Sequence, residues 1–146
     1  FAEAGLSQLA HTQAAEQPWP TLGELIAANH RLVVFTDVGG GARPWLHAEF
    51  QYAFENPWQA AESGDFSCVV DRGTGRGLFV LNHFLSRPLP DREAARVVNR
   101  ALSLRSHIAR CAQERGRVPN FVTVDHYDVG DVLAVVDALN RSRSGG

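Results

Sequence analysis

The chain has 146 residues, a formal net charge of −2 and 21% charged residues. This length is sufficient for one domain with a hydrophobic core. The arginines are scattered rather than gathered into a basic stripe, which argues against nucleic acid as a partner. No apolar run approaches the roughly 18 residues that a membrane-spanning helix needs, so we expect no transmembrane segment.

The N-terminal region carries no strong structural signal. The first residue is Phe1, the chain contains no methionine, and residues 1–17 show neither a strand pattern nor an amphipathic helix. We therefore expect an irregular lead-in over residues 1–18, in a sequence that begins inside a longer protein whose targeting segment lies upstream. Residues 141–146, rich in serine and glycine, are expected to form a flexible tail.

The first predicted elements are a helix and a strand. Thr21 and Glu24 have the spacing of a capping box and predict a helix over residues 22–28. Residues 32–36 predict an apolar strand. The glycines 39–41 that follow are compatible with a phosphate-binding loop, but no dinucleotide-binding or Walker pattern accompanies them, which favours a plain mobile loop.

Residues 45–59 are rich in aromatic side chains without a helical or alternating period. They predict a long loop with a short helix, whose aromatics either line a substrate site or pack over the sheet. Further strands are predicted over residues 67–70, 78–82 and 121–124.

The C-terminal part predicts helices between these strands. Asp91 is the expected N-cap of a helix from residue 92 to about residue 114, with a break near Ser103, and Gly116 is the expected C-cap. A last helix is predicted to start at residues 130–131. The alternation of strands and helices predicts an α/β fold with a mainly parallel sheet.

Polar side chains follow the predicted strands. In a β/α barrel, chemistry collects at the carboxyl ends of the strands, so these residues are candidates for one rim. Side chains alternate along a strand, so only one of Asn82 and His83 is expected to face the site, and Tyr127 is favoured over His126. His11, His30 and His107 lie in loop or helix contexts and are interpreted as ordinary histidines.

The two cysteines, Cys68 and Cys111, do not have a metal-ligand spacing. They are either two small buried side chains or a disulfide, and a catalytic thiol is the least favoured alternative. A disulfide would indicate an oxidising compartment. A secreted or extracytoplasmic location is therefore slightly favoured.

Five segments together resemble the phosphatidylinositol-specific phospholipase C X-domain superfamily of PLC-like phosphodiesterases. They are residues 19–26, 31–37, 66–72, 78–84 and 119–127, and the resemblance covers residues 19–140. It implies the C-terminal half of a distorted TIM barrel with parallel strands. It also implies a phosphoric diester hydrolase or lyase, acting on a phosphodiester such as an inositol phospholipid at a membrane surface.

The resemblance also implies which groups carry out the catalytic steps. One histidine acts as general base and another protonates the leaving group, and both are expected upstream of this chain. An arginine stabilises the phosphate in bacterial members, whereas Ca²⁺ does so in metal-dependent relatives. We expect no metal or other cofactor on this chain, and we expect the chain alone to be inactive.

Individual site residues follow from the same resemblance. Asp125 matches the aspartate that holds the general-base histidine, so it is the predicted catalytic residue. Asp71 matches a residue that contacts inositol hydroxyls, and Asp37 stands where some members have a basic inositol-binding residue. The predicted substrate-binding residues are Asp37, Asp71, Arg72, Asn82, His83 and Tyr127.

Two alternatives stay open. The protein is a non-catalytic binding module that kept the pocket of this family, or it is another TIM-barrel hydrolase such as a glycosidase. A glycosidase would use a pair drawn from Asp37, Asp71 and Asp125 as its two carboxylates.

Overall fold

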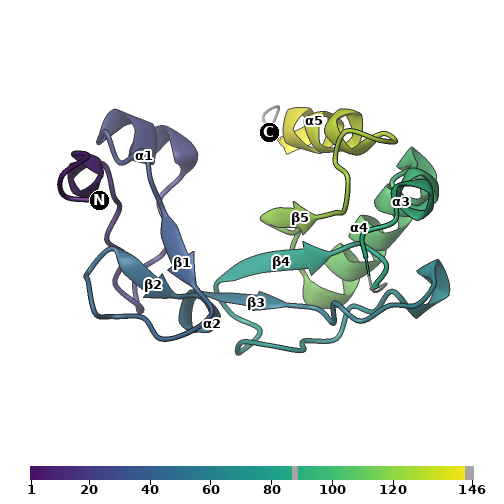
Figure 1. The fold of residues 1–146 in the computed structure, drawn as a ribbon, viewed down its shortest axis with the longest axis horizontal. Coiled ribbons are helices and arrows are strands. Elements are labelled where there is room, and N and C mark those ends of the chain that lie inside the picture. Colours follow the sequence, from purple (N-terminus) through teal and green to yellow (C-terminus); the bar gives the residue numbers. More distant parts are fainter. Residues whose placement is uncertain (87–88, 144–146) are drawn as a thin grey trace. The chain divides into compact units, whose positions relative to one another are not determined.

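The computed structural model describes residues 1–86 and 89–143. The chain divides into two compact units. The first comprises residues 1–54 and 73–77, and the second comprises residues 55–72 and 78–146. Each unit has its own parallel strands and its own helices (Figure 1).

The first unit starts with the 3₁₀ helix η1 (Leu6–Gln8) and the helix α1 (Leu22–Ala27). The predicted capping box is confirmed, because the Thr21 hydroxyl accepts the Glu24 N–H and the Glu24 carboxylate accepts the Thr21 N–H. This arrangement satisfies backbone donors that the helix itself leaves unpaired. Strand β1 (Val34–Thr36) follows and pairs in parallel with β2 (Leu46–Ala48).

The prediction of one long loop over residues 45–59 is wrong in part. The segment forms β2, the short helix α2 (Glu49–Tyr52) and strand β3 (Ala53–Glu55). The helix α2 separates β2 from β3, so neither lies in a continuous apolar run like the one that predicted β1. Gly40 is required by this packing, because a Cβ there would lie 2.6 Å from the Cβ of Ala48 in β2.

The second unit contains a sheet in the order β3-β4-β5, of which Glu55 supplies the last residue of β3. Strand β4 (Leu78–Asn82) pairs in parallel with β5 (Phe121–Thr123). The α/β class with parallel strands is therefore confirmed. The described residues form small sheets of two and three strands, and they do not close into a barrel.

The predicted strand over residues 67–70 is wrong. This segment follows the 3₁₀ helix η2 (Ser63–Asp65) and is irregular up to Arg72, which makes one antiparallel bridge with Glu55. The Ser67 carbonyl explains the difference, because it accepts a hydrogen bond from the side chain of Asn56 instead of from a neighbouring strand. A side-chain donor has replaced a strand ladder here.

Three helices complete the second unit: α3 (Arg92–Val98), α4 (Ala101–Arg115) and α5 (Val132–Arg143). The Asp91 side chain caps α3, and Gly116 ends α4 at φ 68°. The break between α3 and α4 falls at Asn99 and Arg100, before the predicted position near Ser103. The Asp131 carboxylate fixes it there by accepting the Ala101 N–H at 2.8 Å.

Cys68 and Cys111 form a disulfide, which decides between the alternatives left open by the sequence. Both residues are also buried, in a core that includes Phe79, Leu81 and Leu104. The bond ties the irregular segment after η2 to the middle of α4. Residues 141–143 extend α5, and the rest of the expected tail lies outside the described residues.

Candidate active site

A polar cluster lies where β3 and β4 end. Glu55 is the last residue of β3 and Asn82 is the last residue of β4. The Glu55 carboxylate accepts a hydrogen bond from Arg72 Nε at 2.5 Å and another from Asn82 Nδ2 at 3.1 Å. We call Glu55, Asn56, Arg72 and Asn82 the strand-end cluster.

Asn56 fixes the position of Asn82 within this cluster. Its Oδ1 accepts the backbone N–H of Asn82 at 2.7 Å, and its Nδ2 donates to the carbonyls of Asn82 and Ser67. In return, Asn82 Nδ2 donates to the Asn56 carbonyl at 2.9 Å. Both asparagines are buried, and hydrogen bonds link them to each other and to Glu55 and Ser67, so the cluster is held in one arrangement.

The strand-end cluster connects a buried carboxylate to the surface. The Glu55 side chain is 6% exposed, whereas the Arg72 side chain is 46% exposed. A buried carboxylate is stable only with a partner that compensates its charge, and a guanidinium does so strongly. The pair therefore positions a half-exposed guanidinium, the group best suited to bind a phosphate or another oxyanion.

The structure brings the predicted residues Arg72 and Asn82 together, and Asp71 adjoins them. The Asp71 N–H donates to the Glu55 carbonyl at 2.9 Å, and its side chain is exposed. Glu55 is the member that the sequence interpretation missed. Its position inside the aromatic stretch gave no sign that a strand ends there.

His83 does not join this cluster. Its side chain is fully buried and contacts His107, with Nδ1 atoms 2.9 Å apart, while its Nε2 donates to the Val98 carbonyl. Asn82 and His83 point in different directions, as neighbouring strand residues must. The structure therefore places His83 in the core, away from the strand-end cluster, and its predicted role in substrate binding stays a prediction.

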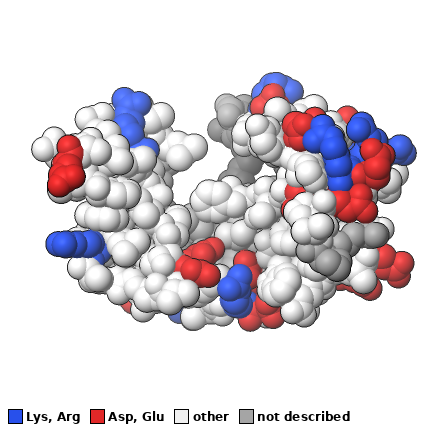
Figure 2. Space-filling model, in the orientation of Figure 1, with Lys and Arg blue, Asp and Glu red and all other residues white. Residues whose placement is uncertain are grey.

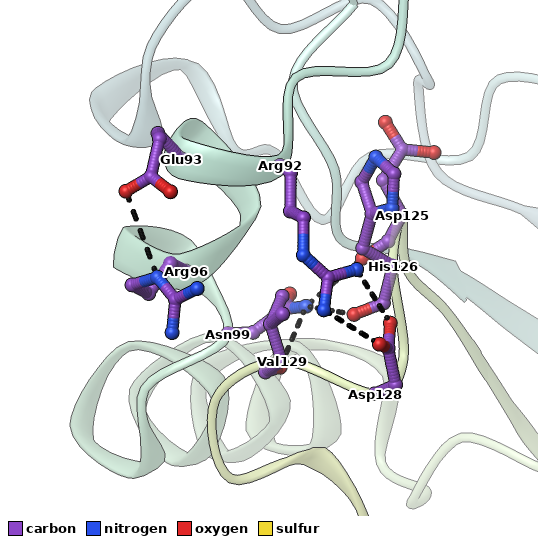
Figure 3. A network of polar contacts seen from close by, with 8 residues as sticks. All are labelled: Arg92, Glu93, Arg96, Asn99, Asp125, His126, Asp128 and Val129. Atoms are coloured by element: carbon purple, nitrogen blue, oxygen red, sulfur yellow. Dashed lines mark hydrogen bonds and ion pairs between the residues drawn. The ribbon is translucent and has the colours of Figure 1, made fainter.

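Asp125 follows β5 and is partly buried. It borders a cavity of about 10 Å³, room for one water molecule, together with Asp91, Phe84 and residues of α3. None of the other residues drawn in Figure 3 donates a hydrogen bond to its carboxylate. Asp71 is hydrogen-bonded to the end of β3, whereas Asp125 follows β5, and their pairing as glycosidase carboxylates stays a prediction.

The loop after Asp125 is held by Asn99 at the end of α3 (Figure 3). Asn99 Nδ2 donates to the carbonyls of Asp125, His126 and Val129. His126 has φ 49°, so the chain has left the strand conformation there. For that reason the alternation expected beyond β5 fails, and Tyr127 is 67% exposed while His126 is partly buried.

Charged side chains of both signs gather over α3 on the face shown in Figure 2. Arg92 binds Asp128 at 2.7 Å, and Arg96 lies 3.6 Å from Glu93. These groups are exposed and paired with one another, so they are typical of a solvated surface. Asp37, which follows β1 in the first unit, is also exposed.

Comparison with known proteins identifies the family. A family model described as PI-PLC X 1 matches residues 1–140. The chain belongs to the PI-PLC X family. It is 34% identical over 136 residues to "PI-PLC X domain-containing protein 1" of Arthroderma benhamiae, a match that covers 84% of this chain and 45% of that protein.

Two other relatives extend this comparison. "PI-PLC X domain-containing protein At5g67130" of Arabidopsis thaliana is 29% identical, with 96% of this chain and 36% of that protein covered. An "Uncharacterized secreted protein" of Arthroderma benhamiae is 27% identical, and the match covers 78% of this chain and 30% of that protein. The chain thus spans less than half the length of these relatives. No solved structure matches it.

The PI-PLC X chain also contains a buried imidazole pair, His83 and His107. Proton positions follow from the partners: His83 Nε2–H binds the Val98 carbonyl, and His107 Nδ1–H binds His83 Nδ1. This leaves His107 Nε2 without a proton, which fits its long 3.4 Å distance to the Ser67 carbonyl. Burial lowers the pKa of both rings, that of His107 to about 4, with the charge of His83 as a further cause.

Cys68, His107 and Cys111 place three potential metal-ligand atoms within 4.8 Å of one another. The two sulfurs are bonded to each other, so no thiolate is available, and we assign this group to the core of the PI-PLC X chain. Across residues 1–86 and 89–143, none of the helices combines the length and the apolar character needed to cross a membrane.

Proposed function

We propose that this chain forms one side of the active site of a phosphodiesterase that cleaves inositol phospholipids or related phosphodiesters. The strand-end cluster is the observation that supports this most. Glu55 and Asn82 hold the Arg72 guanidinium at the carboxyl ends of β3 and β4, where α/β enzymes keep their chemistry.

The proposed role of Arg72 is to stabilise negative charge on the phosphate. Phosphodiester cleavage accumulates charge on the non-bridging oxygens, and a fixed guanidinium lowers the energy of that state. Glu55 serves as a positioning residue, because its hydrogen bond to Nε fixes the guanidinium plane. Asn82 in turn orients Glu55 from the opposite side.

Asp125 is proposed to orient a general-base histidine supplied by a segment outside these 146 residues. A carboxylate beside an imidazole fixes its tautomer and stabilises its charged form. Asp125 lies just beyond the end of β5, and none of the residues drawn with it in Figure 3 donates a hydrogen bond to it, so its carboxylate is suited to this task. In this proposal the strands belong to half of a distorted TIM barrel, and the neighbouring Asp71 and the exposed Tyr127 contact the substrate headgroup.

Two observations indicate the compartment in which this enzyme acts. The Cys68–Cys111 disulfide is suited to an oxidising compartment, and one relative is named a secreted protein. We therefore propose a secreted or extracytoplasmic enzyme that meets its lipid substrate at a membrane surface.

The experiment is to compare Glu55→Gln with Glu93→Gln in the full-length protein, using phosphatidylinositol vesicles as substrate. The glutamine at position 55 keeps the shape of the side chain but removes its charge, and its NH₂ group would face the NH₂ group of Asn82. We expect kcat to fall roughly a hundredfold, as when a stabilising group at an active site is disturbed. Glu93 lies on the surface of α3, so its substitution should leave kcat unchanged.

Cleavage that is equally fast in both variants would contradict the proposed role of the strand-end cluster. Vesicle binding without any cleavage by the unsubstituted full-length protein would instead favour a non-catalytic binding module.

A further inference from the structure

A second histidine pair lies in the first unit, outside the strand-end cluster. His11 Nδ1 is 3.3 Å from His30 Nδ1. Both rings border an open groove of about 520 Å³ whose other walls include Trp19, Glu24 and Leu25. His11 is 9% exposed and His30 is partly buried, so the two rings meet at the edge of the groove.

The orientation of the His11 ring is fixed by Gln13. The Gln13 amide nitrogen donates to the carbonyls of Ala14 and Gln17, so its Oε1 is left as an acceptor for His11 Nε2 at 2.9 Å. His11 therefore carries its proton on Nε2 and presents a lone pair at Nδ1. Histidines that bind metals are oriented in the same way, by an oxygen that accepts the proton of the other ring nitrogen.

The spacing of the two Nδ1 atoms fits a metal chelate. Two nitrogens bound tetrahedrally to zinc at about 2.05 Å lie about 3.4 Å apart. The observed 3.3 Å agrees with this value. Without a metal ion, the same distance is that of a hydrogen bond between the two imidazoles, and metal titration separates the two arrangements.

His47 provides an internal contrast in the same unit. Its Nδ1 donates to the Val34 carbonyl, and its Nε2 accepts the Gln13 backbone N–H. Both ring nitrogens of His47 are committed to the fold. His11 and His30 instead contact each other through Nδ1 beside an open groove, which leaves room for an entry path and for water ligands.

We propose that His11 and His30 bind a divalent first-row transition metal ion, with water in the remaining positions. Imidazole nitrogens favour Cu²⁺, Ni²⁺ and Zn²⁺. Ca²⁺ and Mg²⁺ prefer oxygen ligands and should not bind here. With two protein ligands, the site should bind metal ions more weakly than a structural zinc site does. Its affinity for Cu²⁺ should be higher than its affinity for Zn²⁺.

The test is calorimetric titration of the 146-residue chain with Zn²⁺ and Cu²⁺, compared with its His30→Gln and His126→Asn variants. We expect one equivalent to bind the parent chain and the dissociation constant to rise roughly tenfold or more in His30→Gln, since even outer-shell substitutions cost that much. His126→Asn should bind as the parent does, because asparagine tolerates the left-handed conformation at that position. Paramagnetic Cu²⁺ should broaden the NMR signals of Trp19, whose ring centre is 5.8 Å from that of His11.

Two results would overturn the proposal. One is equal metal affinity in the parent and in a folded His30→Gln variant, checked by circular dichroism, and the other is no saturable binding at all. Either would show that the two rings only form a hydrogen bond. His11→Gln gives an independent variant, and it should weaken binding at least as much as His30→Gln.

Discussion

Two polar clusters in the second unit begin at adjacent residues of β4 but differ in their access to solvent. Asn82 joins Glu55 and Arg72, and this cluster ends at a half-exposed guanidinium. His83 joins His107, and this pair is buried beside Phe66, whose ring lies 4.9 Å from that of His107. This difference in solvent access indicates that a buried polar network is a functional candidate only where one of its residues reaches the surface.

The first prediction concerns the disulfide beside the buried imidazole pair. Replacing both Cys68 and Cys111 with serine should lower the free energy of unfolding by roughly 2–5 kcal/mol, as when a native disulfide is removed from a small domain. Urea titration followed by circular dichroism measures this loss. A loss below about 1 kcal/mol would show that packing alone holds the irregular segment against α4.

The second prediction is a pH dependence from the same cluster. The pKa of His107 is lowered to about 4 in the folded chain, chiefly because burial disfavours its charged form. Between pH 6.5 and 4 the unfolded state therefore binds more protons, so stability is lost as the pH falls through this window. Across this whole pH window, the free energy of unfolding should fall by about 3 kcal/mol.

Urea titrations at pH 7 and at pH 4.5 test this prediction. A His107→Gln variant serves as the control, because it cannot acquire the ring charge and should show a smaller loss between the two values. An equal pH dependence of stability in the variant and the parent would show that His107 is not its source.

The third prediction concerns the loop that follows β5. Asn99→Ala removes the amide that donates to three backbone carbonyls, and Ala cannot replace those bonds. We expect the free energy of unfolding to fall by roughly 1–3 kcal/mol, with faster amide exchange in residues 125–129. Exchange that is unchanged in this loop would indicate that the Arg92–Asp128 pair holds it instead.

Local signals in the sequence predicted the helix ends well. Thr21, Glu24, Asp91 and Gly116 act on neighbouring backbone groups, so their spacing alone was sufficient. The C-terminal limit of α3 was harder to predict, because the Asp131 carboxylate that caps α4 comes from a distant loop.

Long-range contacts set the limits of the sequence interpretation. Glu55 becomes the centre of the strand-end cluster only because Arg72 and Asn82 reach it from other segments. Arg72 and Asn82 were predicted as strand-end polar residues, whereas Glu55 ends a strand that lies in no continuous apolar run and was not recognised. The pairing of Cys68 with Cys111 likewise depends on packing between segments far apart in the chain, so the sequence left it open.

The most direct test of the central claim is the rate of phosphatidylinositol cleavage by full-length Arg72→Gln and Arg96→Gln proteins. Both substitutions remove one partly exposed guanidinium that is paired with a glutamate, so they are closely matched in charge. If Arg72 stabilises the phosphate, its loss should lower kcat/KM by roughly a hundredfold to a thousandfold, and the loss of Arg96 should leave it unchanged. Rates that differ by less than about twofold between the variants would contradict this account.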